Sequence, residues 1–208
     1  MIILNNISKN FGKQKVISDF SLHIEQGSFL SISGQSGSGK STLLNIMGLL
    51  EKPDKGTISI NGKRSFTSKE RLHFYRYQAG FLFQNFALIE SKTVDENLRI
   101  AMTYHKPKNQ SSSDIINRVL TELDLPHNIT QKKVFQLSGG EQQRISLARI
   151  LIKKPQYIFA DEPTGNLDSN NRDIVFARLQ QLNEQGKTVI LVTHDDTLVR
   201  KSAQHIQL

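Results

Sequence analysis

The stretch GQSGSGKS at residues 34–41 has the composition and spacing of a phosphate-binding loop. In its pattern of Gly, four residues, Gly, Lys and Ser, the glycines let backbone N–H groups wrap β- and γ-phosphates. A plain Gly/Ser turn is the alternative, but an apolar strand before the loop and an apolar helix after it favour a nucleotide site. Lys40 would supply a point charge and Ser41 an oxygen ligand for Mg²⁺. The expected nucleotide-binding residues are Gly34, Gln35, Ser36, Gly37, Ser38, Gly39, Lys40, Ser41 and Thr42.

The segment YIFADEPT at residues 157–164 places two carboxylates at the end of an apolar strand. Ligands of open α/β folds bind at the carboxyl ends of the strands, so Asp161 would hold Mg²⁺ together with Ser41. Glu162 would lie near the γ-phosphate and polarise the attacking water. A strand ending in Asp-Glu is also common for ordinary turn reasons. Combined with the phosphate-binding loop, the pair is more typical of a hydrolase than of a passive nucleotide binder.

Two further polar residues follow or interrupt apolar runs. Gln84 lies within FLFQNF at residues 81–86, where it is either an edge-strand polar position or an amide that reaches Mg²⁺ and the attacking water. His194 ends the apolar run of residues 188–194, and a lone histidine there is often a plain surface residue. Its strand would neighbour the strands that carry the phosphate loop and Asp161, which favours a γ-phosphate contact.

A second candidate anion site lies at LSGGEQQR, residues 137–144. Ser138, Gly139 and Gly140 at a helix start would offer a hydroxyl, free N–H groups and the positive end of the helix dipole. An ordinary capped helix explains the same residues, because Glu141 stands three positions after Ser138 and completes a capping box. The spacing alone leaves both interpretations open.

The elements that must position these residues follow an α/β order. Strands are expected at 1–8, 15–24, 28–33, 57–62, 157–161 and 188–194. The last two are almost wholly apolar, as central parallel strands covered on both faces should be. Helical spacing after Ser, Thr or Asp predicts helices at 67–78 and 111–125, with a polar linker at 104–113. A helical insertion within an α/β core is therefore expected.

Bulk composition fits one soluble globular domain. Of the 208 residues, 37% are hydrophobic and 22% charged, and cysteine is absent, which fits a reducing compartment and excludes thiolate metal sites. The N-terminus lacks a signal-peptide pattern, and no apolar run is long enough to cross a bilayer. The net charge of +8 is spread along the whole chain without a basic block, so no specific nucleic-acid partner is expected.

Taken together, these motifs resemble the ATP-binding cassette (ABC) ATPases over essentially the full chain. The resemblance is carried, in order, by the phosphate loop, Gln84, LSGGEQQR, YIFADE, GNLD at 165–168 and His194. It implies a P-loop core with a mostly parallel sheet, an N-terminal antiparallel β subdomain and an inserted α-helical subdomain. The implied division is a single domain, 1–208, with the core at about 1–84 and 155–208 and the helical subdomain at about 85–154.

The resemblance also implies a mechanism shared between two chains. ATP and Mg²⁺ would bind at the phosphate loop, with Phe11 stacking on adenine where the family often has Tyr. Ser138, Gly139 and Gly140 would complete the site of a second, head-to-tail subunit in a homodimer, and Asp168 would link the two sites. Glu162, His194, Gln84 and Lys40 would be the catalytic residues, and Ser41, Gln84 and Asp161 the Mg²⁺ ligands.

A narrower similarity is to the branch that serves macrolide-export and lipoprotein-release transporters, and to small Gram-positive peptide or bacteriocin exporters. It implies an ATPase subunit that lies in the cytoplasm against the membrane and powers a separate integral membrane permease, docked around residues 83–97. The main alternative is a regulatory role of the cell-division type. A soluble DNA- or ribosome-acting ATPase fits less well, because only about a hundred residues separate the loop from LSGG, without heptads or cysteines.

Overall fold

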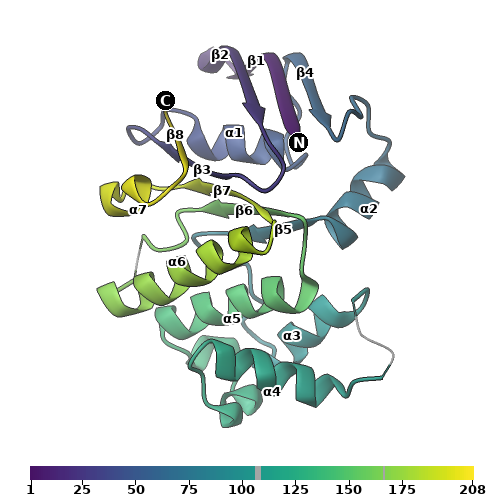
Figure 1. The fold of residues 1–208 in the computed structure, drawn as a ribbon, viewed down its shortest axis with the longest axis vertical. Coiled ribbons are helices and arrows are strands. Elements are labelled where there is room, and N and C mark those ends of the chain that lie inside the picture. The colour runs from purple at the N-terminus through teal and green to yellow at the C-terminus, as the bar shows by residue number, and fades with distance from the viewer. Residues whose placement is uncertain (106–108, 166) are drawn as a thin grey trace.

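A computed structural model describes residues 1–105, 109–165 and 167–208 (Figure 1). Its strands are β1 (Ile2–Phe11), β2 (Gln14–Ile24), β3 (Phe29–Ser33), β4 (Lys55–Ile60), β5 (Ala79–Leu82), β6 (Tyr157–Asp161), β7 (Thr188–Val192) and β8 (Gln204–Gln207). Its helices are α1 (Lys40–Met47), α2 (Ser68–Tyr77), α3 (Val94–Met102), α4 (Ser112–Glu122), α5 (Gly139–Lys153), α6 (Ser169–Glu184) and α7 (Asp196–Arg200), with 3-10 turns η1 (His127–Gln131) and η2 (Val134–Gln136). The chain is therefore α/β, as predicted.

The strands form two sheets. The larger has the order β5-β6-β7-β3-β8, and each of its pairs is parallel. Its strands β6 and β7 are interior and almost wholly buried, which confirms the prediction made from their mostly apolar sequences. The smaller sheet, β2-β1-β4, is antiparallel and comes from the first third of the chain.

Helix α1 lies between the two sheets, as Figure 1 shows. Its apolar side chains pack in one cluster with residues of β1, β2 and β4 on one side and of β3, β6 and β7 on the other. Burying each such side chain contributes about 1.5–3 kcal/mol. The packing fixes the helix so that its N-terminus, at Lys40, stands at the carboxyl end of β3, where the phosphate-binding loop begins.

Helices α3, α4 and α5 gather at the far end of the molecule from the antiparallel sheet (Figure 1). Their apolar faces share a second cluster with one side of the parallel sheet and with α6. The stretch predicted as helical at 111–125 forms α4, and that at 67–78 forms α2. Residues 106–108 of the expected linker and residue 166 of GNLD lie outside the described residues.

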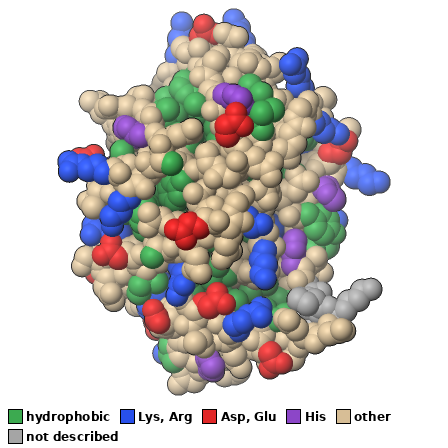
Figure 2. Space-filling model, in the orientation of Figure 1, with side chains coloured by type: hydrophobic (Ala, Val, Ile, Leu, Met, Phe, Trp, Pro, Cys, Tyr) green, Lys and Arg blue, Asp and Glu red, His purple; other side chains and the backbone are tan. Residues whose placement is uncertain are grey.

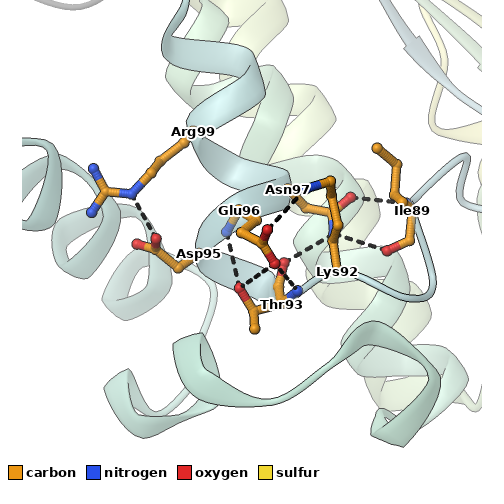
Figure 3. Close-up of polar contacts among 7 residues, drawn as sticks. All are labelled: Ile89, Lys92, Thr93, Asp95, Glu96, Asn97 and Arg99. Atoms are coloured by element: carbon orange, nitrogen blue, oxygen red, sulfur yellow. Dashed lines mark hydrogen bonds and ion pairs between the residues drawn. The ribbon is translucent and has the colours of Figure 1, made fainter.

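The start of α3 is held by a capping box, drawn in Figure 3. Thr93 accepts a hydrogen bond from the Glu96 backbone, and Glu96 accepts one from the Thr93 backbone at 2.8 Å. The hydrogen bond from Lys92 is the largest cause that lowers the pKa of Glu96, to about 2, so its carboxylate is charged at neutral pH. Asn97 is fully buried and bonds to both backbone groups of Ile89 (Figure 3). Asn97 therefore braces the loop from inside and is not itself exposed, while docking around residues 83–97 stays a prediction.

Charged side chains of both signs are interspersed over the face drawn in Figure 2, without a continuous basic stripe. In the described part of the chain, no helix combines the length and apolarity needed to cross a bilayer.

Candidate nucleotide-binding site

The loop between β3 and α1 borders a cavity of about 510 Å³. The loop needs glycine where its backbone is left-handed and closely packed. Gly39 has a φ of +97°, and a Cβ there would lie 2.9 Å from Cγ1 of Val16 on β2. Backbone N–H groups can turn toward a phosphate only if such positions lack side chains. The cavity is lined by Phe11, Val16, Gly34, Ser36, Gly37, Gly39, Lys40, Ser41, Thr42, Gln84, Glu162 and His194.

Lys40 and Ser38 show how the loop is prepared for an anion. The Lys40 ammonium donates to the carbonyl oxygens of Gly34 and Gln35 at 2.9 and 2.8 Å, so it lies folded over the loop at the N-terminus of α1. The hydroxyl of Ser38 is buried without a hydrogen-bond partner among the described residues. Buried polar atoms are ordinarily paired, so this oxygen fits a site completed by a phosphate.

Ser41 and Asp161 meet across the loop. The Ser41 hydroxyl donates to Oδ1 of Asp161 at 3.0 Å, although the two residues are 120 positions apart in the chain. Burial raises the pKa of the Asp161 carboxyl, and the Ser41 hydrogen bond and the Lys40 charge oppose that shift. A partly desolvated carboxylate beside a hydroxyl is a pair of hard oxygen donors, which suits Mg²⁺. The residues present therefore fit the ion that the phosphate loop implies.

Glu162 directly follows β6 in a left-handed conformation, with a φ of +46°. Non-glycine residues hold such a backbone only when their surroundings fix it, and here the Glu162 N–H donates to the Val192 carbonyl at 3.0 Å. Its carboxylate Oε2 lies 2.8 Å from Nδ1 of His194, without the alignment of a hydrogen bond. The turn thus places a carboxylate and an imidazole together at the wall of the cavity.

Gln84 and Phe11 close two other sides of the cavity. Gln84 stands two residues beyond the end of β5, is exposed, and borders a recess shared with Asp161. Phe11 is the last residue of β1 and is 51% exposed, so much of its ring is available for contact. Both lie where the sequence predicted, although their contact with a nucleotide stays a prediction.

The structure does not bring the LSGG residues to this cavity. Ser138 is the N-cap of α5, and it accepts from the Glu141 backbone while its own N–H donates to the Glu141 carboxylate at 2.8 Å. The capping box expected for an ordinary capped helix is therefore present. Ser138 and Gly139 are nevertheless exposed, so the helix start remains accessible to another molecule.

Asp168 also lies away from the cavity, as the N-cap of α6. It accepts from the backbone and side chain of Asn171 at 2.9 and 2.6 Å. The same Asn171 amide packs on the LSGG segment, because a Cβ on Gly140 would lie 2.6 Å from its Nδ2. Sequence reasoning missed this contact and missed Val16, since an asparagine and a valine outside any motif carry no chemical signal.

A glycine-rich loop at a helix N-terminus, with a hydrogen-bonded Ser–Asp pair and a Glu–His pair beside it, defines an α/β nucleotide-binding protein of the phosphate-loop class. The comparison with protein families agrees: residues 17–165 match the ABC transporter family. The chain belongs to that family.

Relatives of known name are similar along all or most of the chain. The macrolide export ATP-binding/permease protein MacB of Campylobacter jejuni is 40% identical over 210 residues, covering 100% of this chain and 33% of MacB. The bacitracin export ATP-binding protein BceA of Halalkalibacterium halodurans is 40% identical over 197 residues, covering 91% of this chain and 78% of BceA. This chain therefore spans about a third of the length of the macrolide-export relatives.

Solved structures place the fold in the same family. A dimeric bacterial ABC transporter cassette superimposes with a TM-score of 0.92 at 37% identity, covering 100% of this chain and 94% of the cassette. A post-hydrolysis state of that cassette, bound to ADP and Pi, gives a TM-score of 0.91 at 36% identity. The predicted fold is confirmed: the chain has the fold of an ABC transporter cassette.

Proposed function

We propose that this chain hydrolyses Mg²⁺-bound ATP at the cavity beside the phosphate-binding loop. The observation that carries the proposal is the convergence of Lys40, Ser41, Glu162 and His194 on one cavity from three separate parts of the sequence. Mg²⁺ would neutralise charge on the β- and γ-phosphates when bound, and Ser41, Asp161 and Gln84 would hold it.

In the proposed reaction, water attacks the γ-phosphorus as the bond to the β-phosphate oxygen breaks, giving ADP and phosphate. Glu162 orients and polarises that water, and His194 steadies the charge that develops on the γ-phosphate. Lys40 leaves the loop carbonyls for phosphate oxygens. Phe11 stacks on the base.

We further propose that two copies pack head to tail, so that each site is completed by its partner. Ser138, Gly139 and Gly140 would contact the γ-phosphate bound by the opposite chain, and Asp168 would lie at the interface. The exposed N-terminus of α5 supports this, because it is an anion-attracting helix end that the chain's own cavity does not use. The dimeric state of the similar cassette supports it as well.

The third part of the proposal is an integral membrane permease that this ATPase drives, in the export of a peptide, bacteriocin or lipophilic cargo. The names of the macrolide- and bacitracin-export relatives support it. The docking surface would be an apolar groove of about 340 Å³ with walls at Phe81, Phe83, Ile100 and Tyr104. It shares Phe83 and Ala87 with the surface expected at 83–97 and continues along α2 and the end of α3. In this arrangement the chain lies on the cytoplasmic face of the membrane, and residues 85–154 move as a helical subdomain.

Purified chain tests the enzymatic part directly. We expect Mg²⁺-dependent phosphate release from ATP that rises with the square of protein concentration at low concentration, because each site needs a partner. Coexpression with the integral membrane protein that co-purifies with this chain tests the transport part, with ATP-dependent cargo efflux as the readout. Phosphate release that is linear in protein concentration throughout would contradict the shared site, and efflux without the chain would contradict the coupling.

A further inference from the structure

Lys9 is a nearly buried lysine next to the base-stacking residue. It lies on β1 with 8% of its surface exposed, two residues before Phe11. Its ammonium stands over the Phe11 ring, 5.3 Å from the centroid. A cation at that distance from an aromatic face is held by the ring quadrupole. The pair therefore fixes an otherwise half-exposed ring.

The same ammonium is anchored to the segment that follows α1. It contacts Oε1 of Glu51 at 2.6 Å, the carbonyl oxygen of Lys52 at 2.9 Å and Oδ1 of Asp54 at 3.4 Å. An ammonium has three N–H donors, so these oxygens account for all of them. The hydrogen bond to Glu51 is the largest cause that raises the pKa of Lys9, which keeps it charged at neutral pH.

Asp54 ties the strand to that segment a second time. Its Oδ2 accepts from the Asn10 backbone at 2.7 Å, and its own N–H donates to the Ser8 carbonyl at 2.9 Å. The strand end that presents Phe11 is thus clamped to the residues that leave α1, the helix whose N-terminus carries the phosphate loop. Lys9 is the member of this clamp that touches the ring itself.

We infer that Lys9 is a positioning residue for the nucleotide base, which sets the Phe11 ring against the purine at a fixed height above the phosphate loop. This rests on the proposed stacking of the base on Phe11. A cation on one face draws π density toward itself, and the opposite face is then better suited to an electron-rich purine. Lys9 thereby links base recognition to phosphate binding without touching the nucleotide.

A purely structural role for Lys9 makes a different prediction. If Lys9 only braced β1, its loss would lower stability and weaken every ligand of the cavity alike. If Lys9 positions the ring, its loss should weaken the binding only of ligands that carry a base. Inorganic tripolyphosphate has the phosphates of ATP and no base, so it separates the two roles.

The experiment measures ATP and tripolyphosphate affinity by calorimetry, with Mg²⁺, for the parent, Lys9→Met and Lys15→Met. Lys15 is an exposed lysine on β2, so its variant removes the same charge from the same hairpin. We expect Lys9→Met to lower the affinity for ATP about 5- to 30-fold, the range that the loss of a desolvated cation–π contact supports. Its tripolyphosphate affinity should stay within about twofold of that of Lys15→Met.

A double-mutant cycle with Phe11→Leu gives the decisive readout. In the Phe11→Leu background, Lys9→Met should no longer lower the affinity for ATP, because there is no ring to position. If Lys9→Met does not fold, Glu51→Gln takes its place in the same cycle. That variant weakens the ion pair that holds the Lys9 ammonium but leaves the ammonium itself in the protein. Equal losses for ATP and tripolyphosphate, or a loss that persists without the ring, would overturn the inference. A parent that binds neither ligand would overturn the proposed function instead.

Discussion

Arg149 on α5 donates a hydrogen bond from Nη1 to the carbonyl oxygen of Ala87 at 2.7 Å. Its Nη2 donates to the Phe86 carbonyl at 2.9 Å, and the hydroxyl of Ser146 donates to the same oxygen at 3.0 Å. Phe86 and Ala87 have φ values of +62° and +48°, a left-handed backbone that costs non-glycine residues about 1 kcal/mol or more. The helix that begins at LSGG therefore holds the loop that carries Gln84.

Replacing Arg149 by lysine should release this loop. A lysine keeps the charge but cannot donate two hydrogen bonds from one planar group, so the carbonyl of Phe86 or that of Ala87 loses the donor that Arg149 provides. We expect Arg149→Lys to lower the free energy of unfolding by about 1–3 kcal/mol in urea denaturation. Arg118→Lys, at an exposed position of α4, is the matched control and should change it by less than about 0.5 kcal/mol. Equal stability of the two variants would mean that Arg149 does not brace the loop.

Glu162→Gln should separate nucleotide binding from hydrolysis. Glutamine keeps the shape of the side chain but cannot polarise water as a carboxylate does, so we expect phosphate release to fall by about 100-fold or more. ATP affinity should be retained, and a nucleotide-bound dimer should accumulate in light scattering. Glu184→Gln, exposed at the end of α6, is the control and should behave as the parent. Unaltered hydrolysis in Glu162→Gln would remove this residue from the catalytic step.

Lys40→Ala tests the phosphate-binding loop. The ammonium serves two purposes in the structure, as the charge at the N-terminus of α1 and as the donor that folds the loop through Gly34 and Gln35. Its loss should lower the affinity for ATP about 10- to 100-fold, which is the effect of losing one or two charged hydrogen bonds. Binding of a fluorescent ATP analogue measures this, with Lys69→Ala on the exposed face of α2 as control. Parent-like turnover in Lys40→Ala would refute the loop as the ATP site.

Much of the fold was predictable because its signals are local. The strands β6 and β7 have mostly apolar sequences, and each ends within two residues of its expected end. No comparable signal marks β8, whose sequence QHIQ is polar and mostly exposed. It becomes a strand only because β3 offers an unpaired edge in parallel register, which is a property of the assembled sheet.

The site residues were likewise predictable only where their signal is local. Loop residues such as Lys40 and Ser41 are recognisable from spacing because their chemistry depends on neighbours in sequence. Contacts such as that of Asn171 with Gly140 join segments that are distant in sequence, and nothing in the local sequence predicts them. Asn97 shows the same limit, because nothing in its local sequence indicates that its buried amide bonds to both backbone groups of Ile89.

Lys153 should give the protein a distinctive alkaline stability profile. Burial, with a smaller contribution from Arg149, lowers the pKa of Lys153 to about 8. Between about pH 8 and the usual lysine pKa of 10.5, the unfolded chain therefore binds more protons than the folded one, and stability rises with pH. We expect the free energy of unfolding of the parent to rise relative to Lys153→Met across this window. Parallel profiles of the two proteins would show that Lys153 titrates normally in the folded state.

Ser138→Arg tests whether the LSGG segment serves a second chain. The segment lies outside the chain's own cavity, so an arginine there should leave ATP affinity within about twofold of the parent while its bulk prevents closure of the dimer. Hydrolysis should fall by about 100-fold or more, as expected when transition-state donors are lost. The substitution also removes an N-cap, which costs about 1 kcal/mol by itself.

Ser111→Arg supplies the matched control for that cost, because Ser111 is likewise the N-cap of its helix, α4, and accepts from the backbone of Ser113. Both variants lose a cap and gain the same side chain, but only one alters LSGG. We therefore expect Ser111→Arg to lose stability and keep hydrolysis and nucleotide-dependent dimerisation. If Ser138→Arg hydrolyses ATP as fast as Ser111→Arg, the head-to-tail site is wrong, and the start of α5 is an ordinary capped helix.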